Sequence, residues 1–196
     1  SVGTSLVFKS YMRTDELLVA AISVVDTVMN LAFIVFGGLS SAIAIFIGGK
    51  LGAGKLDEAK SDAKKIITFG VMVSMVLGGI LFCVAPYIHN LYVLSEDAIY
   101  ALEVLIRIKS CLMPIYVVNV CTFFVLRAGG DAFSTMLIDS GFLWVGPVAV
   151  STLLSIFTPI EVVPLYITVE LLDLVKMFIA FWFLKRGHWV RNLAAD

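Results

Sequence analysis

Long apolar stretches, broken by short charged segments, set the pattern of the sequence. The stretch between Asp26 and Lys50 carries no charge, and four further apolar runs follow it. Because about 20 apolar residues cross the hydrocarbon core of a bilayer as an α-helix, these runs predict transmembrane spans. The expected spans cover about 19–49, 64–88, 98–126, 132–158 and 162–185. Residues 1–18 precede them as a stub, which we interpret as the end of an earlier helix and its exit loop.

The third expected span is bordered by charges close to its ends. Arg107 and Arg127 are 20 residues apart, which is roughly 30 Å along a helix and about one hydrocarbon thickness. We therefore expect Arg107 and Lys109 to extend toward one membrane surface and Arg127 to lie at the other. Pro114 lies inside this span and predicts a kink.

Composition supports a membrane environment. Hydrophobic residues make up 60% of the 196 residues, charged residues make up 15%, and the mean hydropathy is +1.02. A soluble domain of this size has too much surface to cover for so apolar a chain. The predicted fold is therefore an all-α membrane protein, a polytopic helical bundle in contact with the lipid bilayer. The net charge of −1 gives no reason to expect a nucleic-acid partner.

Basic residues concentrate on one side of the predicted bundle, in the loop after the first span and in the C-terminal tail. They are Lys50, Lys55, Lys60, Lys64, Lys65, Lys185, Arg186 and Arg191. The segments 87–97 and 158–164 on the other side contain no Lys or Arg, although Lys9 and Arg13 in the stub run against the pattern. The positive-inside rule then places the Lys-rich loop and the C-terminus in the cytoplasm. We expect a multi-pass protein of the plasma membrane.

No catalytic constellation accompanies these spans. The two histidines, His89 and His188, fall on opposite sides of the predicted membrane, and neither has a nucleophile or metal ligand near it in sequence. The three cysteines, Cys83, Cys111 and Cys121, lie in apolar stretches without metal-binding spacing. We therefore expect no enzyme, no catalytic residue, no metal site and no cofactor.

Charged residues inside the last expected span are the most informative feature, because lipid makes each of them costly. Glu170, Asp173 and Lys176 are three residues apart and share one broad helix face. Asp173 is twelve residues from both Glu161 and Lys185, roughly 18 Å, which places it near mid-bilayer. Asp173 and Lys176 can pair, which leaves Glu170 without a local partner. Two interpretations stay open: a structural ion pair that fixes helix packing, or a proton or cation site.

Three more polar residues are candidates for the same roles. Asp139 lies eight residues beyond Asp131, roughly 12 Å into the membrane if Asp131 marks the surface. It is either a hydrogen-bond partner for a neighbouring helix or a coupling site. Asp26 and Asn30 share a helix face at i, i+4, although Asp26 also fits the outer end of its span.

The stretch LRAGGDAFSTMLIDSGFLWVGPV resembles the Arg-Ala-Gly-Gly-Asp loop and following helix of the multidrug and toxic-compound extrusion (MATE) family. The matching positions are Arg127, Gly129, Gly130, Asp131, Asp139, Trp144 and Pro147. Upstream, the Gly52-Ala-Gly54 turn is similar to the same family's preceding helix pair. Downstream, Asp173 to Lys176 and the tail from Trp189 to Asn192 are similar to its last helix and terminus. Ala132 departs from the family, which often has a threonine and a proline at this helix entry.

The resemblance implies one six-helix lobe, the C-terminal one, of a twelve-helix transporter, with its first helix truncated. Its partner would be the N-terminal lobe of the same full-length protein. The implied activity is secondary active antiport, in which small organic, often cationic, compounds leave in exchange for H⁺ or Na⁺. Candidate coupling or substrate residues are Asp26, Asn30, Asp139, Glu170, Asp173 and Lys176. Two alternatives are a flippase for lipid-linked precursors, supported only by Arg107 and Lys109, and a membrane subunit that does not transport.

Overall fold

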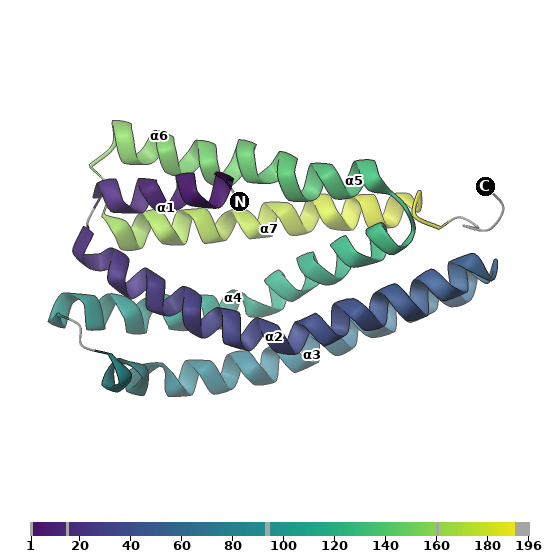
Figure 1. The fold of residues 1–196 in the computed structure, drawn as a ribbon, viewed down its shortest axis with the longest axis horizontal. Coiled ribbons are helices and arrows are strands. Elements are labelled where there is room, and N and C mark those ends of the chain that lie inside the picture. The colour runs from purple at the N-terminus through teal and green to yellow at the C-terminus, as the bar shows by residue number, and fades with distance from the viewer. Residues whose placement is uncertain (1, 15, 93–94, 160, 191–196) are drawn as a thin grey trace. The chain divides into compact units, whose positions relative to one another are not determined.

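The computed structural model describes residues 2–14, 16–92, 95–159 and 161–190. Arg191 and Asn192, which belong to the tail named above, lie outside the described residues. The described chain contains helices and no strand, which confirms the all-α prediction. The helices, labelled in Figure 1, are α1 (Val2–Thr14), α2 (Glu16–Gly52), α3 (Leu56–Ile88), α4 (Glu96–Ala128), α5 (Ala132–Met136), α6 (Ala149–Phe157) and α7 (Val162–Arg186).

Shorter helical segments complete the path of the chain. A 3₁₀ turn, η1 (His89–Leu91), follows α3. Two π-helical segments, η2 (Leu137–Gly141) and η3 (Trp144–Val148), lie between α5 and α6. Pro147 sits inside η3, where its missing N–H removes one regular helical hydrogen bond. Wider π turns accommodate such a disruption without ending the helix.

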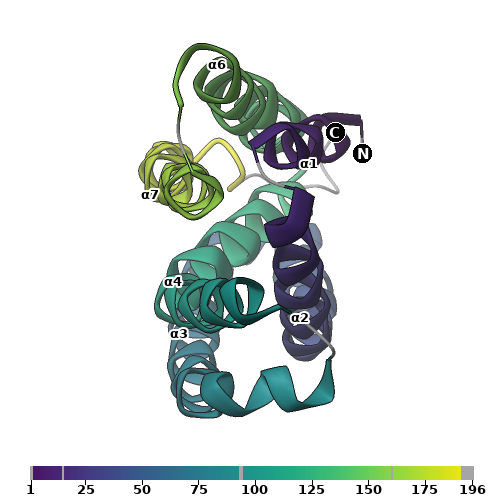
Figure 2. The same cartoon turned by 90° about the vertical axis from the view of Figure 1, so that its left-hand side faces the viewer.

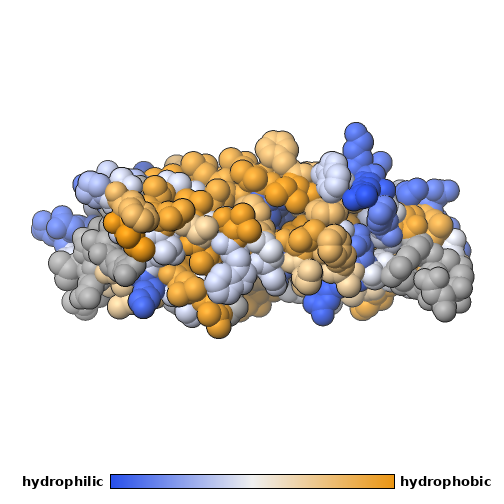
Figure 3. Space-filling view, turned by 90° about the horizontal axis from the view of Figure 1, so that it is seen from above, coloured by the Kyte–Doolittle hydropathy of each residue, from blue (hydrophilic) through white to orange (hydrophobic). Residues whose placement is uncertain are grey.

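Three helical stretches are long and apolar enough to cross a membrane: Leu56–Leu91, Glu96–Ala128 and Ala132–Phe157. Helix α2 makes a fourth if its parts Val19–Ile34 and Phe36–Gly52 count as one span. The remaining long helix, α7, has sufficient length but holds Glu170, Asp173 and Lys176 within its apolar sequence. The chain is therefore an integral membrane helical bundle. Exposed apolar side chains cover much of the face shown in Figure 3, as lipid contact requires.

Residue contacts divide the chain into two compact units. Unit 1 comprises Ser1–Ala32, Met75–Met113 and Phe142–Leu172. Unit 2 comprises Phe33–Ser74, Pro114–Gly141 and Asp173–Asp196. The assignment of all residues to one lobe of a transporter stays a prediction.

Close helix packing in unit 1 depends on small residues. Helix α1 packs against α6, and the two lie side by side in Figures 1 and 2. Between α3 and α4, a Cβ built on Gly78 would lie 2.6 Å from the Ser110 carbonyl oxygen. That carbonyl is the one that Pro114, four residues later, leaves without its usual helical donor. A glycine here lets the two backbones approach in a way that no larger residue permits.

Unit 2 is held together by a similar contact among three helices. A Cβ on Gly70 of α3 would lie 2.7 Å from Leu39 of α2, 3.1 Å from Val117 and 3.3 Å from Cys121 of α4. The rings of Phe33 and Tyr116 stack at 4.2 Å between centroids and join α2 to α4. The apolar faces of these helices are therefore buried against one another rather than against lipid.

Candidate functional site

An ion pair between two helices of unit 1 is the main polar contact of the bundle. The Lys109 ammonium of α4 donates a hydrogen bond to Glu170 Oε1 of α7 at 2.9 Å. Both side chains are mostly buried, with 18% and 14% of their surface exposed. The partner that Glu170 lacks on its own helix is therefore Lys109 of α4. The extension of Lys109 toward a membrane surface stays a prediction. A charge in an apolar bundle is costly, and an opposite charge within hydrogen-bond distance offsets part of that cost.

Two tyrosines border this ion pair. Lys109 Nζ lies 5.6 Å from the centroid of the Tyr166 ring, and Tyr166 in turn lies 5.5 Å from the ring of Tyr11 on α1. Tyr166 is only 2% exposed, and its hydroxyl has no hydrogen-bond partner among the described residues. Because Tyr166 precedes Glu170 by one helical turn, both side chains lie on the same face of α7. The i, i+4 spacing of Tyr166 and Glu170 is the one feature of the sequence that could have identified this tyrosine as part of the site.

A second carboxylate acts on the same ion pair. Asp26 of α2 interacts electrostatically with Lys109 and with Glu170. It lies on the exposed surface of unit 1, and Asn30 is exposed one turn further along α2. Two carboxylates and one ammonium leave the cluster of Asp26, Lys109 and Glu170 with one net negative charge. The cluster can therefore take up one further positive charge.

Arg107, two residues before Lys109, also has a carboxylate partner. Its guanidinium contacts Glu103 at 2.6 Å on the same helix and lies 5.3 Å from the centroid of the Phe82 ring. The basic side chains of α4 in unit 1 are thus both neutralised by glutamates. Neither presents a free positive charge to an anionic substrate.

The remaining candidate charges of the last two spans belong to unit 2. Asp139 is exposed on η2, and no described residue donates a hydrogen bond to its side chain. Asp173 follows Glu170 on α7, and its backbone carbonyl accepts a hydrogen bond from Asn119 Nδ2 at 3.0 Å. The pairing of Asp173 with Lys176, which their spacing allows, stays a prediction. The structure thus brings Asp26, Glu170 and Lys109 together in unit 1, whereas Asp139, Asp173 and Lys176 belong to unit 2.

The Arg-Ala-Gly-Gly-Asp loop owes its composition to the turn that it forms. Gly130 has a positive φ of 71°, a conformation that L side chains rarely adopt. The amides of Gly130 and Asp131 donate to the carbonyls of Arg127 and Leu126 at 3.0 and 3.1 Å, which is a Schellman cap of α4. Gly54, with φ 72°, closes α2 by the same pattern.

Gly129 is required for a different reason. A Cβ at this position would lie 2.2 Å from the carbonyl oxygen of Trp189, so only glycine allows the tail to pass this close. Trp189 is buried, and its indole N–H donates to the Leu184 carbonyl at 3.0 Å. The loop and the segment after α7 are therefore packed together in unit 2.

Asp131 begins the next helix. Its carboxylate accepts hydrogen bonds from the Ser134 amide at 3.1 Å and from the Ser134 hydroxyl at 2.8 Å. These contacts form an ordinary N-cap of α5. The departure from the family at Ala132 thus leaves the helix entry intact, because Ser134 rather than a threonine or proline completes the cap. Of the other matching positions, Trp144 is exposed and Pro147 lies in η3.

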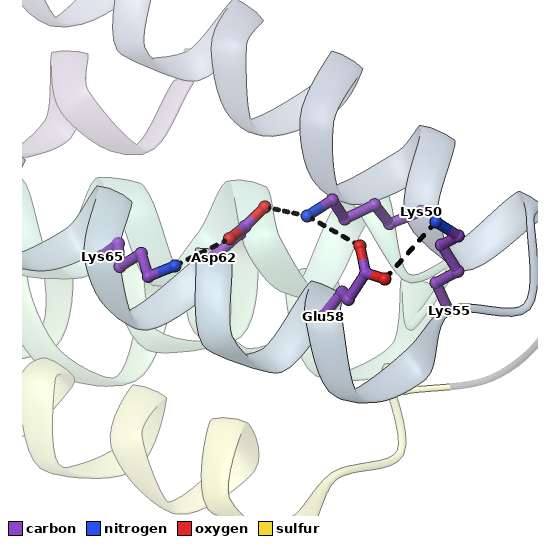
Figure 4. Close-up of polar contacts among 5 residues, drawn as sticks. All are labelled: Lys50, Lys55, Glu58, Asp62 and Lys65. Carbon is purple, nitrogen blue, oxygen red and sulfur yellow. Dashed lines mark hydrogen bonds and ion pairs between the residues drawn. The ribbon is translucent and has the colours of Figure 1, made fainter.

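Figure 4 shows a network of charges where α2 meets α3. Lys50 forms ion pairs with Asp62 and, at 3.2 Å, with Glu58. Lys55 contacts Glu58 at 3.4 Å, and Lys65 contacts Asp62 at 3.5 Å. The hydrogen bonds to Lys50 lower the pKa of both carboxyl groups, and the bond to Asp62 raises the pKa of Lys50. Three of the lysines in this loop are therefore balanced by acids.

A pocket of ≈ 1120 Å³ lies between α3 and the end of α7 in unit 2. We call it the basic pocket. It is lined by Leu56, Lys60, Ala63, Lys64, Ile67, Thr68, Phe178, Phe181, Trp182, Leu184, Lys185, Arg186, Gly187, Trp189 and Val190. Four of these residues are cationic, and none of the described lining residues is acidic. The sequence pattern alone does not predict that the lysines of α3 and the basic end of α7 line one pocket.

The fold defines a class, that of multi-pass helical membrane proteins. A family model described as MatE matches residues 4–145. This is more than half of the sequence, and the chain belongs to the MatE family. The match includes the Arg-Ala-Gly-Gly-Asp loop, Asp139 and Trp144, whereas the resemblance of Pro147, α7 and the tail stays a prediction. A search of curated proteins and a search of solved structures each found no match.

Proposed function

We propose that this chain is one lobe of a twelve-helix secondary active antiporter. It would export small organic, often cationic, compounds in exchange for H⁺ or Na⁺, together with the N-terminal lobe of the same full-length protein. Family membership supports the transport class. The observation that carries the coupling proposal is the cluster of Asp26, Lys109 and Glu170, which holds two carboxylates against one ammonium.

Coupling follows from this excess of negative charge. A proton or Na⁺ that binds Asp26 or Glu170 competes with Lys109 for the carboxylates and makes the cluster neutral. The bound and empty states then differ in how strongly α2, α4 and α7 are held together. A cation that prefers one arrangement of the helices shifts the population toward it, which is the requirement for alternating access.

The flippase alternative has less support. A flippase for lipid-linked phosphates needs cations that face its cavity, and Arg107 and Lys109 were the candidates. Each is paired with a glutamate of unit 1, Glu103 or Glu170. The charge that remains in this region is negative, which favours a cationic substrate or ion.

Replacement of Asp26 tests the coupling proposal. Asp26→Asn leaves the Lys109–Glu170 pair intact, so we expect the full-length protein to insert normally. Dye efflux in efflux-deficient cells should then lose its dependence on Na⁺ or on pH, each varied separately. Asp57→Asn, which removes an exposed carboxylate of the α2–α3 region, is the matched control and should behave as wild type. Asp26→Asn efflux with the wild-type ion response would contradict the assignment.

Asp139, one of the two candidate carboxylates of unit 2, can be tested in the same assay. Asp139→Asn should retain the ion response if the Asp26 cluster couples transport. Loss of the response in Asp139→Asn together with its retention in Asp26→Asn would move the coupling site to η2.

We also propose a plasma-membrane location with the Lys-rich α2–α3 turn and the C-terminus in the cytoplasm. The excess of lysine in this region supports that orientation. In a background without the native cysteines, Asn90→Cys should react with an impermeant maleimide in intact cells and Ser61→Cys should not. Reversed labelling would overturn the orientation.

A further inference from the structure

The basic pocket changes in polarity along its length. Lys185 and Arg186 line one end of it, and Phe178 lies eight residues before Arg186 on the same helix. Eight helical residues cover roughly 12 Å. The pocket therefore joins a cationic part, at its mouth, to an apolar part lined by the buried Ile67 and the exposed Phe178. A ligand that fills both parts must carry an anionic group on an apolar chain.

The cations at the mouth are available, unlike those of the neighbouring turn. Glu58 and Asp62 are taken up by Lys50, Lys55 and Lys65. Neither Lys64 nor Lys185 has an ion pair among the described residues. Lys60 meets only the exposed Asp57, at 3.9 Å. The acids of this region are thus occupied elsewhere, and positive charge accumulates in the pocket.

Among the described residues, Arg186 contacts an aromatic ring and forms no ion pair with a carboxylate. Its guanidinium lies 5.2 Å from the centroid of the Trp182 ring. Such a contact positions a guanidinium while leaving its N–H donors available for an anion. Trp182 is itself a residue type that favours the boundary between lipid and water.

We propose that the basic pocket binds an acidic phospholipid. The phosphate lies among Lys64, Lys185 and Arg186, and an acyl chain extends past Phe178 between α3 and α7. A lipid fits better than a free phosphate because its acyl chain also covers the apolar part of the pocket, where the exposed Phe178 lies. The volume exceeds the upper end of the usual range for small-molecule sites, roughly 1,000 Å³, which suits an amphiphile.

Tryptophan quenching by brominated lipids tests this site directly. The chain has three tryptophans, of which Trp182 and Trp189 line the pocket and Trp144 does not. In a Trp144→Phe background, purified in a nonionic detergent, the remaining fluorescence reports the pocket. Brominated phosphatidylglycerol should quench it at a lower concentration than brominated phosphatidylcholine. Each cation near the phosphate contributes about fivefold, so three predict a preference on the order of 100-fold.

Matched variants separate this site from general charge attraction. Lys64→Gln/Lys185→Gln/Arg186→Gln should reduce the preference for phosphatidylglycerol to within a few-fold of that for phosphatidylcholine. Lys9→Gln/Lys55→Gln/Lys65→Gln removes the same charge outside the pocket and should keep it. Circular dichroism checks folding, and the single variant Lys64→Gln, with an expected loss of about fivefold, decides the question if the triple variant does not fold.

Two results would overturn the proposal. The first is an unchanged preference for phosphatidylglycerol when the pocket cations are removed. The second is reversal of the quenching by inorganic phosphate in excess, which would make the pocket a site for soluble anions. Persistence of the quenching in phosphate supports the lipid. Transport measurements do not enter this test, so its outcome is independent of the antiport proposal.

Discussion

Lys109 and Glu170 lie 61 residues apart in the chain and meet at 2.9 Å between α4 and α7. Each side chain carries the charge that compensates the other, because an apolar bundle stabilises an unpaired charge poorly. Removal of Lys109 leaves the mostly buried Glu170 carboxylate without this cation, which costs more than the pair itself contributes. The pair is therefore expected to act on stability as well as on transport.

Substitution of Lys109 tests this asymmetry. Lys109→Met should lower the free energy of unfolding by about 3 kcal/mol, because the Glu170 carboxylate loses its cation. Lys109→Met/Glu170→Met removes both charges and should recover most of the loss. Reversible denaturation in detergent micelles, followed by circular dichroism, measures the difference. A double variant no more stable than Lys109→Met would show that the pair contributes packing rather than charge compensation.

The two glycines of the loop after α4 should respond differently to substitution. Gly129→Ala places a Cβ against the Trp189 carbonyl, and the segment after α7 must move, at a cost of roughly 1–3 kcal/mol. Gly130→Asn is the matched comparison, because asparagine adopts a positive φ more readily than other residues. It should cost less than Gly129→Ala. Thermal unfolding measures both, and fluorescence of Trp189 should shift only in Gly129→Ala.

The charge network of the α2–α3 turn predicts a loss of stability in acid. The pKa values of Asp62 and Glu58 lie below their ordinary 3.8 and 4.5 in the folded state, chiefly because of hydrogen bonds to Lys50. Their contribution to the free energy of unfolding is complete at a pH above these ordinary pKa values. It is lost as the pH falls through the lowered pKa values of the folded state. The Tm of the wild type should therefore fall more between pH 5 and about pH 3 than that of Asp62→Asn.

The same network predicts the opposite behaviour in base. The pKa of Lys50 is raised above 10.5 in the folded state. The contribution of Lys50 to the free energy of unfolding is therefore complete below pH 10.5 and is lost as the pH rises through the raised pKa. Salt should reduce both effects, since these side chains lie at the surface. Identical acid profiles for the wild type and Asp62→Asn at low salt would contradict the network.

The helices could be predicted from the sequence because the apolar runs and their charged borders are local features. Helices lie within each range predicted as a span, and Gly54 and Gly130 end helices as their loops indicate. The bounds of the spans in the membrane stay a prediction. The partner of Glu170 could not be predicted in this way. Position along the last helix predicts Asp173 as the carboxylate nearest mid-bilayer. The lysine that pairs with Glu170 lies on another helix, so the sequence of the last helix alone does not reveal it.

The basic pocket shows the same limit. In the sequence, Lys64 and Lys185 contribute separately to the predicted orientation of the chain, because a count of loop charges does not say which loops meet. Their assembly depends on the packing of α3 beside the end of α7 in unit 2. Helix periodicity gives the faces of each helix, and only the three-dimensional packing pairs those faces with one another.

Gly78 and Gly79 are adjacent residues of α3 that provide a controlled test of helix packing. Both are expected to carry the same intrinsic cost of glycine in a helix, so Gly79→Ala should stabilise the protein by about 0.5–1 kcal/mol, since nothing lies within 4 Å of the added Cβ. Gly78→Ala gains the same propensity but places its Cβ 2.6 Å from the Ser110 backbone oxygen, which cannot turn away as a side chain does.

The contact with Ser110 should therefore outweigh the gain in helix propensity. We expect Gly78→Ala to destabilise the protein by roughly 1–3 kcal/mol relative to Gly79→Ala, measured by reversible denaturation in the same detergent. Pro114 explains why this carbonyl is the point of contact. It leaves the Ser110 carbonyl without its helical donor, and Gly78 is the residue that approaches that carbonyl. Equal stabilities for the two variants would mean that α3 and α4 are not in backbone contact at this level of unit 1.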